Sequence, residues 1–250
     1  MGRDSWAFNL FTGLVVFSIC GTLFSRIFHS DPGFIAPLSG ALLIVLGAVC
    51  VIRQITSLAS VFGLFAVGTV AELAGLFTGI PFGRYEYTQN WWPTIQLGQH
   101  LFPLLLPFAW LMIAGASFLS LRRLMAPLPA ALAGAFLSAL IDMPMELAMT
   151  HVFKYWEWHQ HGGFFGAPAS NFVGWLFISL IAGLILASTQ KKKDIDASAA
   201  HVLSYFCAFL AIAGITQFMS LAWFLLLFFS LGLWVLGRVL PIKTSPPRNM

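Results

Sequence analysis

The stretch that decides the fold runs from Ala130 to Met149 and reads AALAGAFLSALIDMPMELAM. A helix that crosses a lipid bilayer needs about 20 predominantly apolar residues. This stretch supplies them with only two charged side chains, Asp142 and Glu146, which lie near its end. The sequence therefore predicts a membrane-spanning helix that carries two carboxyl groups.

Similar apolar runs recur along the whole chain, and the last is about twice as long as one span. We interpret the last run as a helical hairpin that turns near Gln217–Ser220. The prediction is an all-α fold, a polytopic transmembrane bundle of about eight helices, or seven if the last run does not divide. It forms a single domain over residues 1–240, followed by a disordered cytoplasmic tail over residues 241–250. The further runs are Trp6–Phe24, Gly33–Ile52, Ile55–Phe77, Leu101–Leu121, Phe172–Ala187 and Ala199–Leu240.

The composition indicates the same class of protein. Of the 250 residues, 59% are hydrophobic and 9% are charged, whereas a soluble domain carries about 25% charged residues. The chain is therefore neither a soluble domain nor a nucleic-acid-binding protein, and its expected surroundings are membrane lipid. Its cysteines lie inside apolar runs and show neither a disulfide framework nor a metal-binding spacing (Cys20, Cys50 and Cys207).

The basic residues predict the orientation in the membrane, because cytoplasmic loops are enriched in Lys and Arg. In the eight-helix arrangement one side holds ten of them, and the other side holds only Arg26, Arg84 and Lys154. A seven-helix arrangement would move three of the ten across and weaken this bias, so the even count is favoured. Both termini are then expected in the cytoplasm. The ten residues are Arg3, Arg53, Arg122, Arg123, Lys191, Lys192, Lys193, Arg238, Lys243 and Arg248.

Five of the nine acids collect at the opposite, extracytoplasmic face. They lie near the ends of the third and fifth helices or in the loops that follow. Two of them, Glu86 and Glu157, belong to the loops and are expected to be solvated. This face is therefore where we expect an active site.

The other three acids, Glu72, Asp142 and Glu146, lie within apolar runs. An ionisable group inside a membrane is costly, and a functional role is the default expectation. The structural alternative is that these acids form ion pairs with Arg84 or Lys154, which stand on the same side.

Asp142 and Glu146 are four residues apart and share one helix face. Two carboxyl groups this close in a low dielectric cannot both ionise cheaply, so we expect one of them to keep its proton and serve as an acid. Glu72 shares a face with Gly75 and Gly79, and these glycines are expected to let another backbone approach closely.

The loops beside these acids are rich in Tyr, Trp and His. Aromatic residues gather at membrane interfaces whatever the function, so such a belt is one interpretation of Tyr85 and Tyr87. His151, His159 and His161 raise the question of a metal ion. The sequence lacks the paired histidine boxes of membrane di-iron enzymes, and we expect no metal site.

Several motifs, taken in order, resemble one known family. They are similar to the integral membrane family of carotenoid biosynthesis that includes the 1′,2′-type carotenoid hydratases and the bisanhydrobacterioruberin hydratase, over about residues 65–180. The chain departs from the family in one place, because Leu147 stands where a proline is expected after the second carboxylate, and Pro144 precedes it. The motifs are Glu72-Leu-x-Gly75-x-x-Thr78-Gly79-x-Pro81-Phe82-Gly83-x-Tyr85-x-Tyr87, Leu97-Gly98, Pro103…Pro107-x-x-Trp110, Asp142…Glu146, Trp156-x-Trp158 and Phe165-Gly166-x-Pro168-x-x-Asn171-Phe172-x-Gly174-Trp175.

The resemblance implies a hydro-lyase of a bacterial or archaeal cell membrane, which adds water to the terminal C=C bond of an acyclic carotenoid that enters from the bilayer. Such a reaction requires no cofactor. A neutral carboxyl group among Asp142, Glu146 and Glu72 would protonate the alkene. Aromatic faces would stabilise the tertiary carbocation, and a second carboxylate or Asn171 would hold the water. The expected substrate-binding residues are Tyr85, Tyr87, Trp156, Trp158, Asn171 and Trp175.

Two rival functions stay open at this point. A lycopene cyclase of the membrane type starts with the same protonation, but an internal double bond captures the cation, and Pro144-Met-Glu146 is similar to the Pro-x-Glu of such cyclases. A non-catalytic carotenoid or lipid transporter, or an accessory protein, would use intramembrane acids for proton coupling. The acids lie near one surface and no inverted repeat is visible, which argues against a transporter.

Overall fold

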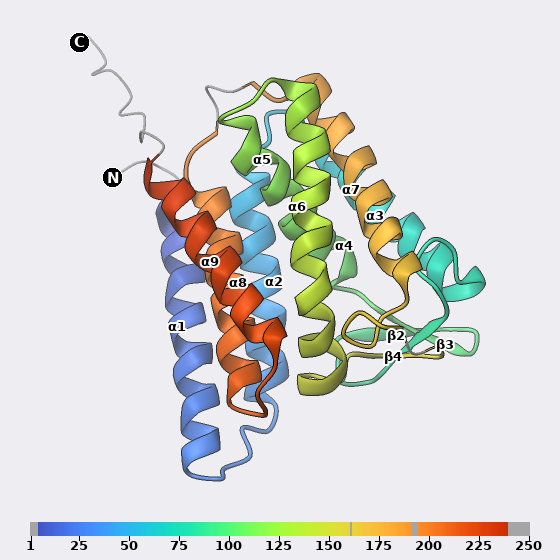
Figure 1. The fold of residues 1–250 in the computed structure, drawn as a ribbon, viewed down its shortest axis with the longest axis vertical. Coiled ribbons are helices and arrows are strands. Elements are labelled where there is room, and N and C mark those ends of the chain that lie inside the picture. The colour runs from blue at the N-terminus through green and yellow to red at the C-terminus, as the bar shows by residue number, and fades with distance from the viewer. Residues whose placement is uncertain (1–4, 161, 192–194, 240–250) are drawn as a thin grey trace.

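The computed structural model describes residues 5–160, 162–191 and 195–239 and confirms the all-α fold (Figure 1). Seven helices in these residues are long and apolar enough to cross a membrane. An eighth, shorter helix is built from α4, the π-helical segment η1 and α5, and a second π-helical segment, η2, extends α6. The helices are α1 (Ser5–Ile27), α2 (Ile35–Ile52), α3 (Leu58–Thr78), α4 (Leu106–Trp110), η1 (Leu111–Gly115), α5 (Ala116–Arg122), α6 (Pro127–Leu147), η2 (Ala148–Val152), α7 (Ala169–Thr189), α8 (Ser198–Ile215) and α9 (Leu221–Val239).

The long last run divides as expected. It forms α8 and α9, and the residues between them, 216–220, include the predicted turn. The first residues of α1 and the last residues of α9 lie at the same end of the bundle (Figure 1). The assignment of that end to the cytoplasm stays a prediction, and the expected disordered tail, residues 241–250, lies outside the described residues.

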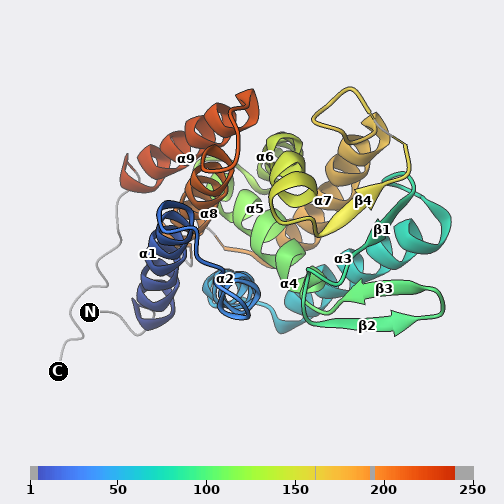
Figure 2. The same ribbon diagram turned by 90° about the horizontal axis from the view of Figure 1, so that it is seen from below.

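The prediction of a full span over Leu101–Leu121 is wrong in its first part. His100–Pro103 forms a strand, and the helix begins only at Leu106. Proline has no N–H to donate, and two prolines in this segment delay the helix start. The helix that follows is apolar all round, which is typical of a helix in the core. Figure 2 shows it in the middle of the molecule, between α2, α3, α6, α7 and α8.

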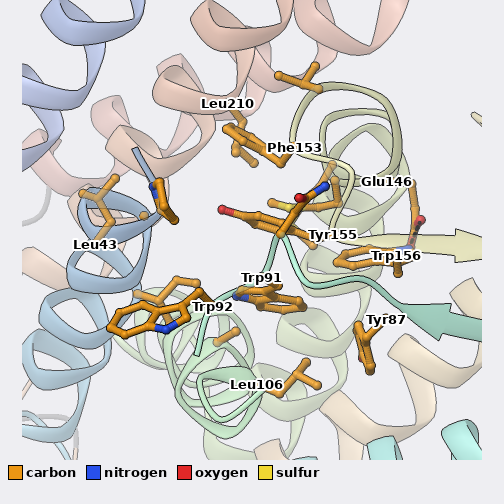
Figure 3. A pocket seen from close by; sticks show the side chains of 18 of the residues that line it. Leu43, Tyr87, Trp91, Trp92, Leu106, Glu146, Phe153, Tyr155, Trp156 and Leu210 are labelled. Carbon is orange, nitrogen blue, oxygen red and sulfur yellow. Dashed lines mark hydrogen bonds between the residues drawn. The ribbon is translucent and has the colours of Figure 1, made fainter. Parts of the chain in front are cut away.

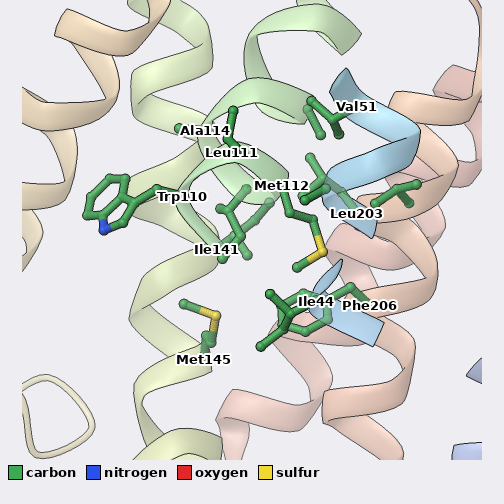
Figure 4. Packing of buried hydrophobic residues seen from close by; sticks show 14 of the residues in the cluster. Ile44, Val51, Trp110, Leu111, Met112, Ala114, Ile141, Met145, Leu203 and Phe206 are labelled. Atoms are coloured by element: carbon green, nitrogen blue, oxygen red, sulfur yellow. The ribbon is translucent and has the colours of Figure 1, made fainter. Parts of the chain in front are cut away.

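The main core forms around this central helix. Leu111, Met112 and Ala114 are at most 3% exposed. Figure 4 shows Met112 directed toward Ile44 of α2 and Leu203 of α8, and all these residues belong to one hydrophobic core. This packing holds the central helix in place. It therefore also fixes Trp110, the buried last residue of α4, which belongs to the site described below.

Four short strands, which the helical reading of the sequence did not predict, close one end of α3, α6 and α7 (Figure 1). Strand β1 pairs antiparallel with β4, although 68 residues of chain lie between the end of β1 at Tyr87 and the start of β4 at Trp156. Strands β2 and β3 form a second antiparallel ribbon. The strands are β1 (Tyr85–Tyr87), β2 (Thr94–Leu97), β3 (His100–Pro103) and β4 (Trp156–Trp158).

The β1–β4 ribbon presents one face to the bundle and one to the surroundings, because successive side chains of a strand alternate. Tyr85, Tyr87 and Trp156 are buried. Their neighbours Glu86 and Glu157 are paired across the strands and exposed, as the sequence predicts. The ribbon therefore inserts its aromatic side chains into the bundle.

Candidate active site

Glu72 lies in the last turns of α3 and is 5% exposed. Its Oε2 accepts hydrogen bonds from the hydroxyls of Tyr85 and Tyr87, each at 2.7 Å. Its Oε1 accepts a hydrogen bond from Trp110 Nε1 at 2.8 Å. Hydrogen bonds to a carboxylate stabilise its charged form, so this arrangement suits an ionised Glu72.

The glycine face of α3 makes room for these donors. A Cβ atom added to Gly75 would lie 2.7 Å from the Tyr85 hydroxyl and 2.8 Å from Phe82 Cδ2. The sequence predicted the approach of another backbone at this face. That expectation is wrong at Gly75, where the structure places aromatic side chains, whereas at Gly79 the backbone of the following turn comes within 3.5 Å of an added Cβ atom, at the Gly83 carbonyl carbon. Gly79 ends the helix with a left-handed φ of 79° and turns the chain toward β1.

The two tyrosines are suited to donating. Burial, followed by the nearby Glu72 carboxyl, holds the pKa of Tyr85 and of Tyr87 well above the ordinary value. Both hydroxyls therefore keep their protons over the physiological pH range.

Asp142 and Glu146 lie on α6, are at most 1% exposed and are bridged by one amide. Asn171 Nδ2, in the first turn of α7, donates to Asp142 Oδ2 and to Glu146 Oε1, each at 2.8 Å. The second oxygen of Glu146 accepts hydrogen bonds from Trp158 Nε1 at 2.9 Å and Trp156 Nε1 at 3.2 Å. The Oδ1 of Asp142 has no hydrogen-bond partner among the described residues. The predicted carboxyl pair therefore exists, and its two members differ in their hydrogen bonding.

The β1–β4 ribbon connects the Glu72 and Glu146 carboxyl groups. Tyr85 is paired with Trp158 across the strands, and Tyr87 is paired with Trp156. In each pair the tyrosine donates to Glu72 and the tryptophan donates to Glu146. One ribbon thus positions both acids through its alternating aromatic side chains.

A cavity of about 570 Å³ opens beside these acids, and Figure 3 shows part of its wall. Glu72 and Glu146 line it, whereas Asp142 is not among the lining residues. The three predicted catalytic residues therefore lie in one region, and two of them, Glu72 and Glu146, face the cavity. All the predicted substrate-binding residues line it, namely Tyr85, Tyr87, Trp156, Trp158, Asn171 and Trp175.

Sequence reasoning missed Trp110 as a site residue. Its indole donates to Glu72 and stacks on Trp175 with 4.1 Å between the ring centroids. Gly68 of α3 allows this position, since an added Cβ atom there would lie 2.7 Å from Trp110 Cβ. The sequence nevertheless contains a sign of this role. Trp110 carries an indole N–H in an otherwise apolar run, and a buried N–H needs a hydrogen-bond partner.

The alternatives of ion pairing and metal binding have no support in the described part of the chain. The partners of Glu72, Asp142 and Glu146 there are the aromatic and amide side chains named above, and neither Arg84 nor Lys154 is among them. No group of three or more His, Cys, Asp or Glu side chains in residues 5–160, 162–191 and 195–239 is placed to hold a metal ion.

The histidines near the site point elsewhere. His159 pairs with Glu86 at 3.3 Å on the outer face of the ribbon, where both are exposed. His151 is exposed and its Nδ1 contacts the Thr150 hydroxyl at 2.8 Å. His161 lies outside the described residues.

The fold and the site together define an integral membrane protein of the helical-bundle class, with buried carboxyl groups on the wall of an internal cavity. The chain belongs to the carotenoid biosynthesis protein family, whose model matches residues 34–238. The resemblance observed in the sequence is thereby confirmed, and the family gives the protein a role in carotenoid biosynthesis. No curated protein and no solved structure matches the chain.

Proposed function

We propose that the protein is a carotenoid hydratase that adds water to the terminal double bond of an acyclic carotenoid end group. The observation that carries the proposal is the presence of two buried carboxyl groups, Glu72 and Glu146, on the wall of one cavity in a protein of carotenoid biosynthesis. Most of the other lining residues are apolar or aromatic, which suits a hydrocarbon ligand that enters from the bilayer.

The proposed reaction has two steps. A carboxylic acid transfers its proton to the inner CH carbon of the double bond, and the π electrons form the new C–H bond. This leaves a tertiary cation on the outer carbon, which carries the two methyl groups. A water molecule then attacks this cation, and the oxonium group loses a proton to a carboxylate. One water is consumed, a tertiary alcohol is formed, and the acid is restored when the accepted proton returns to it.

Glu146 is the proton donor in this proposal, and Asp142 is a positioning residue that acts through it. Glu146 lines the cavity and Asp142 lies behind it. The Asn171 amide donates to both groups, which holds them close. Two carboxyl groups in such a site share one proton more cheaply than they lose both.

Glu72 takes the opposite role. Glu146 also accepts three hydrogen bonds, but it shares the Asn171 amide with a second carboxyl group, which favours a retained proton there. The three donors to Glu72, which are Tyr85, Tyr87 and Trp110, bond to no other acid and stabilise a negative charge on it. We therefore assign Glu72 as the carboxylate that stabilises the cation and accepts the proton from water. The stacked rings of Trp110 and Trp175 add aromatic faces beside the acids. A cation held over such a face is stabilised by about 2 kcal/mol when both groups are desolvated.

The membrane side of the reaction follows from the orientation rule. The acids lie toward the end of the bundle opposite the loops that hold Arg53 and Arg123 (Figure 1). Since cytoplasmic loops are enriched in basic residues, we place the active site at the extracytoplasmic face.

The test is expression of the chain in a lycopene-producing host, followed by mass analysis of the pigments. A product heavier by one water per reacted end supports the hydratase. A ring-bearing isomer of lycopene identifies a cyclase instead. Unchanged pigment in the presence of folded protein contradicts both and leaves a carotenoid-binding or transport role.

A further inference from the structure

The cavity carries a second group of hydrogen-bonding side chains, on a stretch of wall that contains neither acid. Ser18 and Trp91 line the cavity and are each 6% exposed. Neither the Ser18 hydroxyl nor the Trp91 indole N–H has a hydrogen-bond partner among the described residues. The Tyr155 hydroxyl, which also belongs to the cavity wall, makes no hydrogen bond within that part of the chain.

Ser18 of α1 stands level with Gly40 of α2. These helices are antiparallel neighbours, and a Cβ atom added to Gly47 would lie 3.3 Å from Phe11 Cε2. Ser18 lies seven residues after Phe11, and Gly40 lies seven residues before Gly47. Seven residues are about two helical turns, so Ser18 lies on the same face of α1 as Phe11, and Gly40 lies on the same face of α2 as Gly47. Because the helices are antiparallel, the step from Phe11 to Ser18 and the step from Gly47 to Gly40 move along the bundle in the same direction.

Tyr155 approaches the same point from the other wall. Its ring stacks on Trp91 with the centroids 5.1 Å apart and an angle of 13° between the planes. A Cβ atom added to Gly40 would lie 3.1 Å from the Tyr155 hydroxyl. Figure 3 shows this oxygen pointing toward α2, away from Glu146. The absence of a side chain at Gly40 therefore leaves space in front of the Tyr155 hydroxyl, level with Ser18.

Two other hydroxyls of α1 show which partner the helix itself offers to such a group. Thr12 and Thr22, also on α1, donate to the carbonyl oxygens four residues before them, at 2.9 and 2.8 Å. Ser18 does not use this option, and a buried polar group without a partner is unfavourable. Its hydroxyl is therefore available to something inside the cavity.

We propose that Ser18, Trp91 and Tyr155 form a second polar subsite of the cavity, which binds an uncharged hydroxyl oxygen carried by the ligand or by a water molecule. The proposal rests on the proposed function only in taking the cavity as the carotenoid site. All three groups can donate a hydrogen bond, and Trp91 can only donate, so the atom that they suit is an acceptor oxygen.

The occupant is uncharged for two reasons. Glu72 and Glu146 are the charged side chains of the described cavity wall, and both belong to the acid site. Burial raises the pKa of Tyr155 to about 12, so its hydroxyl stays neutral and keeps its proton for donation. An ion at this point would have no opposite charge to compensate for its loss of water.

The experiment measures binding to the full-length protein in detergent, from the absorption shift of the polyene during titration. The probes are lycopene and its 1-hydroxy derivative. The variants are Tyr155→Phe, which keeps the stacked ring, and Ser18→Ala, which removes one oxygen atom. Tyr205→Phe is the matched control, because Tyr205 is an aromatic residue of α8 that does not line the cavity.

Two results support the subsite and identify its occupant. If the ligand carries the hydroxyl, each variant weakens binding of the hydroxylated probe by about fivefold, the scale of one hydrogen bond, and leaves lycopene binding unchanged. If water occupies the subsite, both probes bind as they do to the wild type. Conversion of lycopene then falls by about fivefold or more, while deuterium from D₂O still enters the end group and reports intact protonation.

The remaining results overturn a part of the reasoning. Unchanged binding of both probes together with unchanged conversion overturns the subsite and leaves the hydratase standing. A wild-type protein that binds both probes without converting lycopene contradicts the proposed function, while the binding arm still decides on the subsite. A wild-type protein that binds neither probe overturns both proposals.

Discussion

Glu146 combines complete burial, a place on the cavity wall and three hydrogen-bond donors, and it therefore offers the most direct test at the scale of a residue. Glu146→Gln keeps the side-chain shape and removes the transferable proton. We expect conversion of lycopene in the producing host to fall at least about 100-fold, the lower range for loss of a general acid. Glu157→Gln is the control, because Glu157 lies on β4 beside the donors and is exposed. Conversion by Glu146→Gln at the wild-type rate would contradict the assignment.

Asp142→Asn tests whether Asp142 and Glu146 must share a proton for the reaction to proceed. The change leaves the cavity wall intact, because Asp142 does not line it, but it removes one of the two groups that hold the proton. We expect loss of most conversion with normal expression, measured by pigment analysis and by the amount of folded protein in detergent. Full activity would show that Glu146 works without its neighbour.

Trp158→Phe isolates one hydrogen bond while keeping an aromatic ring. The change removes the donor at 2.9 Å from Glu146 Oε2 and leaves the β1–β4 register in place. Glu146 becomes negatively charged as it gives up its proton, and a hydrogen bond to a charged group contributes about 1.5–3 kcal/mol. We therefore expect conversion to fall by about tenfold or more. Trp234→Phe is the control, since Trp234 lies on α9 and is 38% exposed. Equal conversion by Trp158→Phe and Trp234→Phe would show that the indole N–H is not needed.

The sequence reveals some of these residues and hides others for a physical reason. An acid in an apolar run is conspicuous by its cost, so Glu72, Asp142 and Glu146 are predictable one by one. Their partners are not, because Trp110 donates to Glu72 across 38 residues of chain, and no local pattern records such a contact. The aromatic residues were expected to bind substrate, and the structure adds that several of them hold the acids.

At the scale of elements, the β1–β4 ribbon depends on the turn that precedes it. Gly83 has a φ of 114°, which residues with a side chain rarely adopt, and an added Cβ atom would lie 2.9 Å from Pro168 Cγ. Gly83→Ala is therefore unfavourable for two reasons, the backbone conformation and the contact with Pro168. We expect it to cost about 1–3 kcal/mol and to lower both the unfolding temperature in detergent and the conversion of lycopene.

The matched control for this turn is Gly163→Ala. Gly163 lies in the loop after β4, has no heavy atom within 4 Å of an added Cβ atom and has no positive φ. Its unfolding temperature should equal that of the wild type. A Gly83→Ala protein with wild-type stability and activity would show that the ribbon tolerates a different turn.

Hydropathy predicts the helices well because each must be long and apolar to cross a bilayer. It fails over Leu101–Leu121, where the same apolar character comes from burial inside the protein. The strands escape prediction because a segment of three or four residues is too short to show a pattern. Their alternation is nevertheless visible afterwards, since Tyr85-Glu-Tyr87 and Trp156-Glu-Trp158 each place one acid between two aromatic residues.

At the scale of the whole molecule, the bundle separates its basic end from its acid site. The described basic residues of one end include Arg53 and Arg123, and those of the other end include Arg26 and Lys154 (Figure 1). Because cytoplasmic loops are enriched in basic residues, we expect the β2–β3 ribbon outside the cell and the connection between α5 and α6 inside it.

Cysteine labelling in intact cells tests that orientation. Gln99→Cys introduces a thiol at an exposed position of the β2–β3 connection, and Met125→Cys introduces one between α5 and α6, where Met125 is 38% exposed. A membrane-impermeant maleimide should label Gln99→Cys in intact cells and Met125→Cys only after permeabilisation. The wild-type protein, with its own cysteines inside helices, supplies the background. The reverse pattern would place the acid site at the cytoplasmic face, and the water for the proposed reaction would then enter from the cytoplasm.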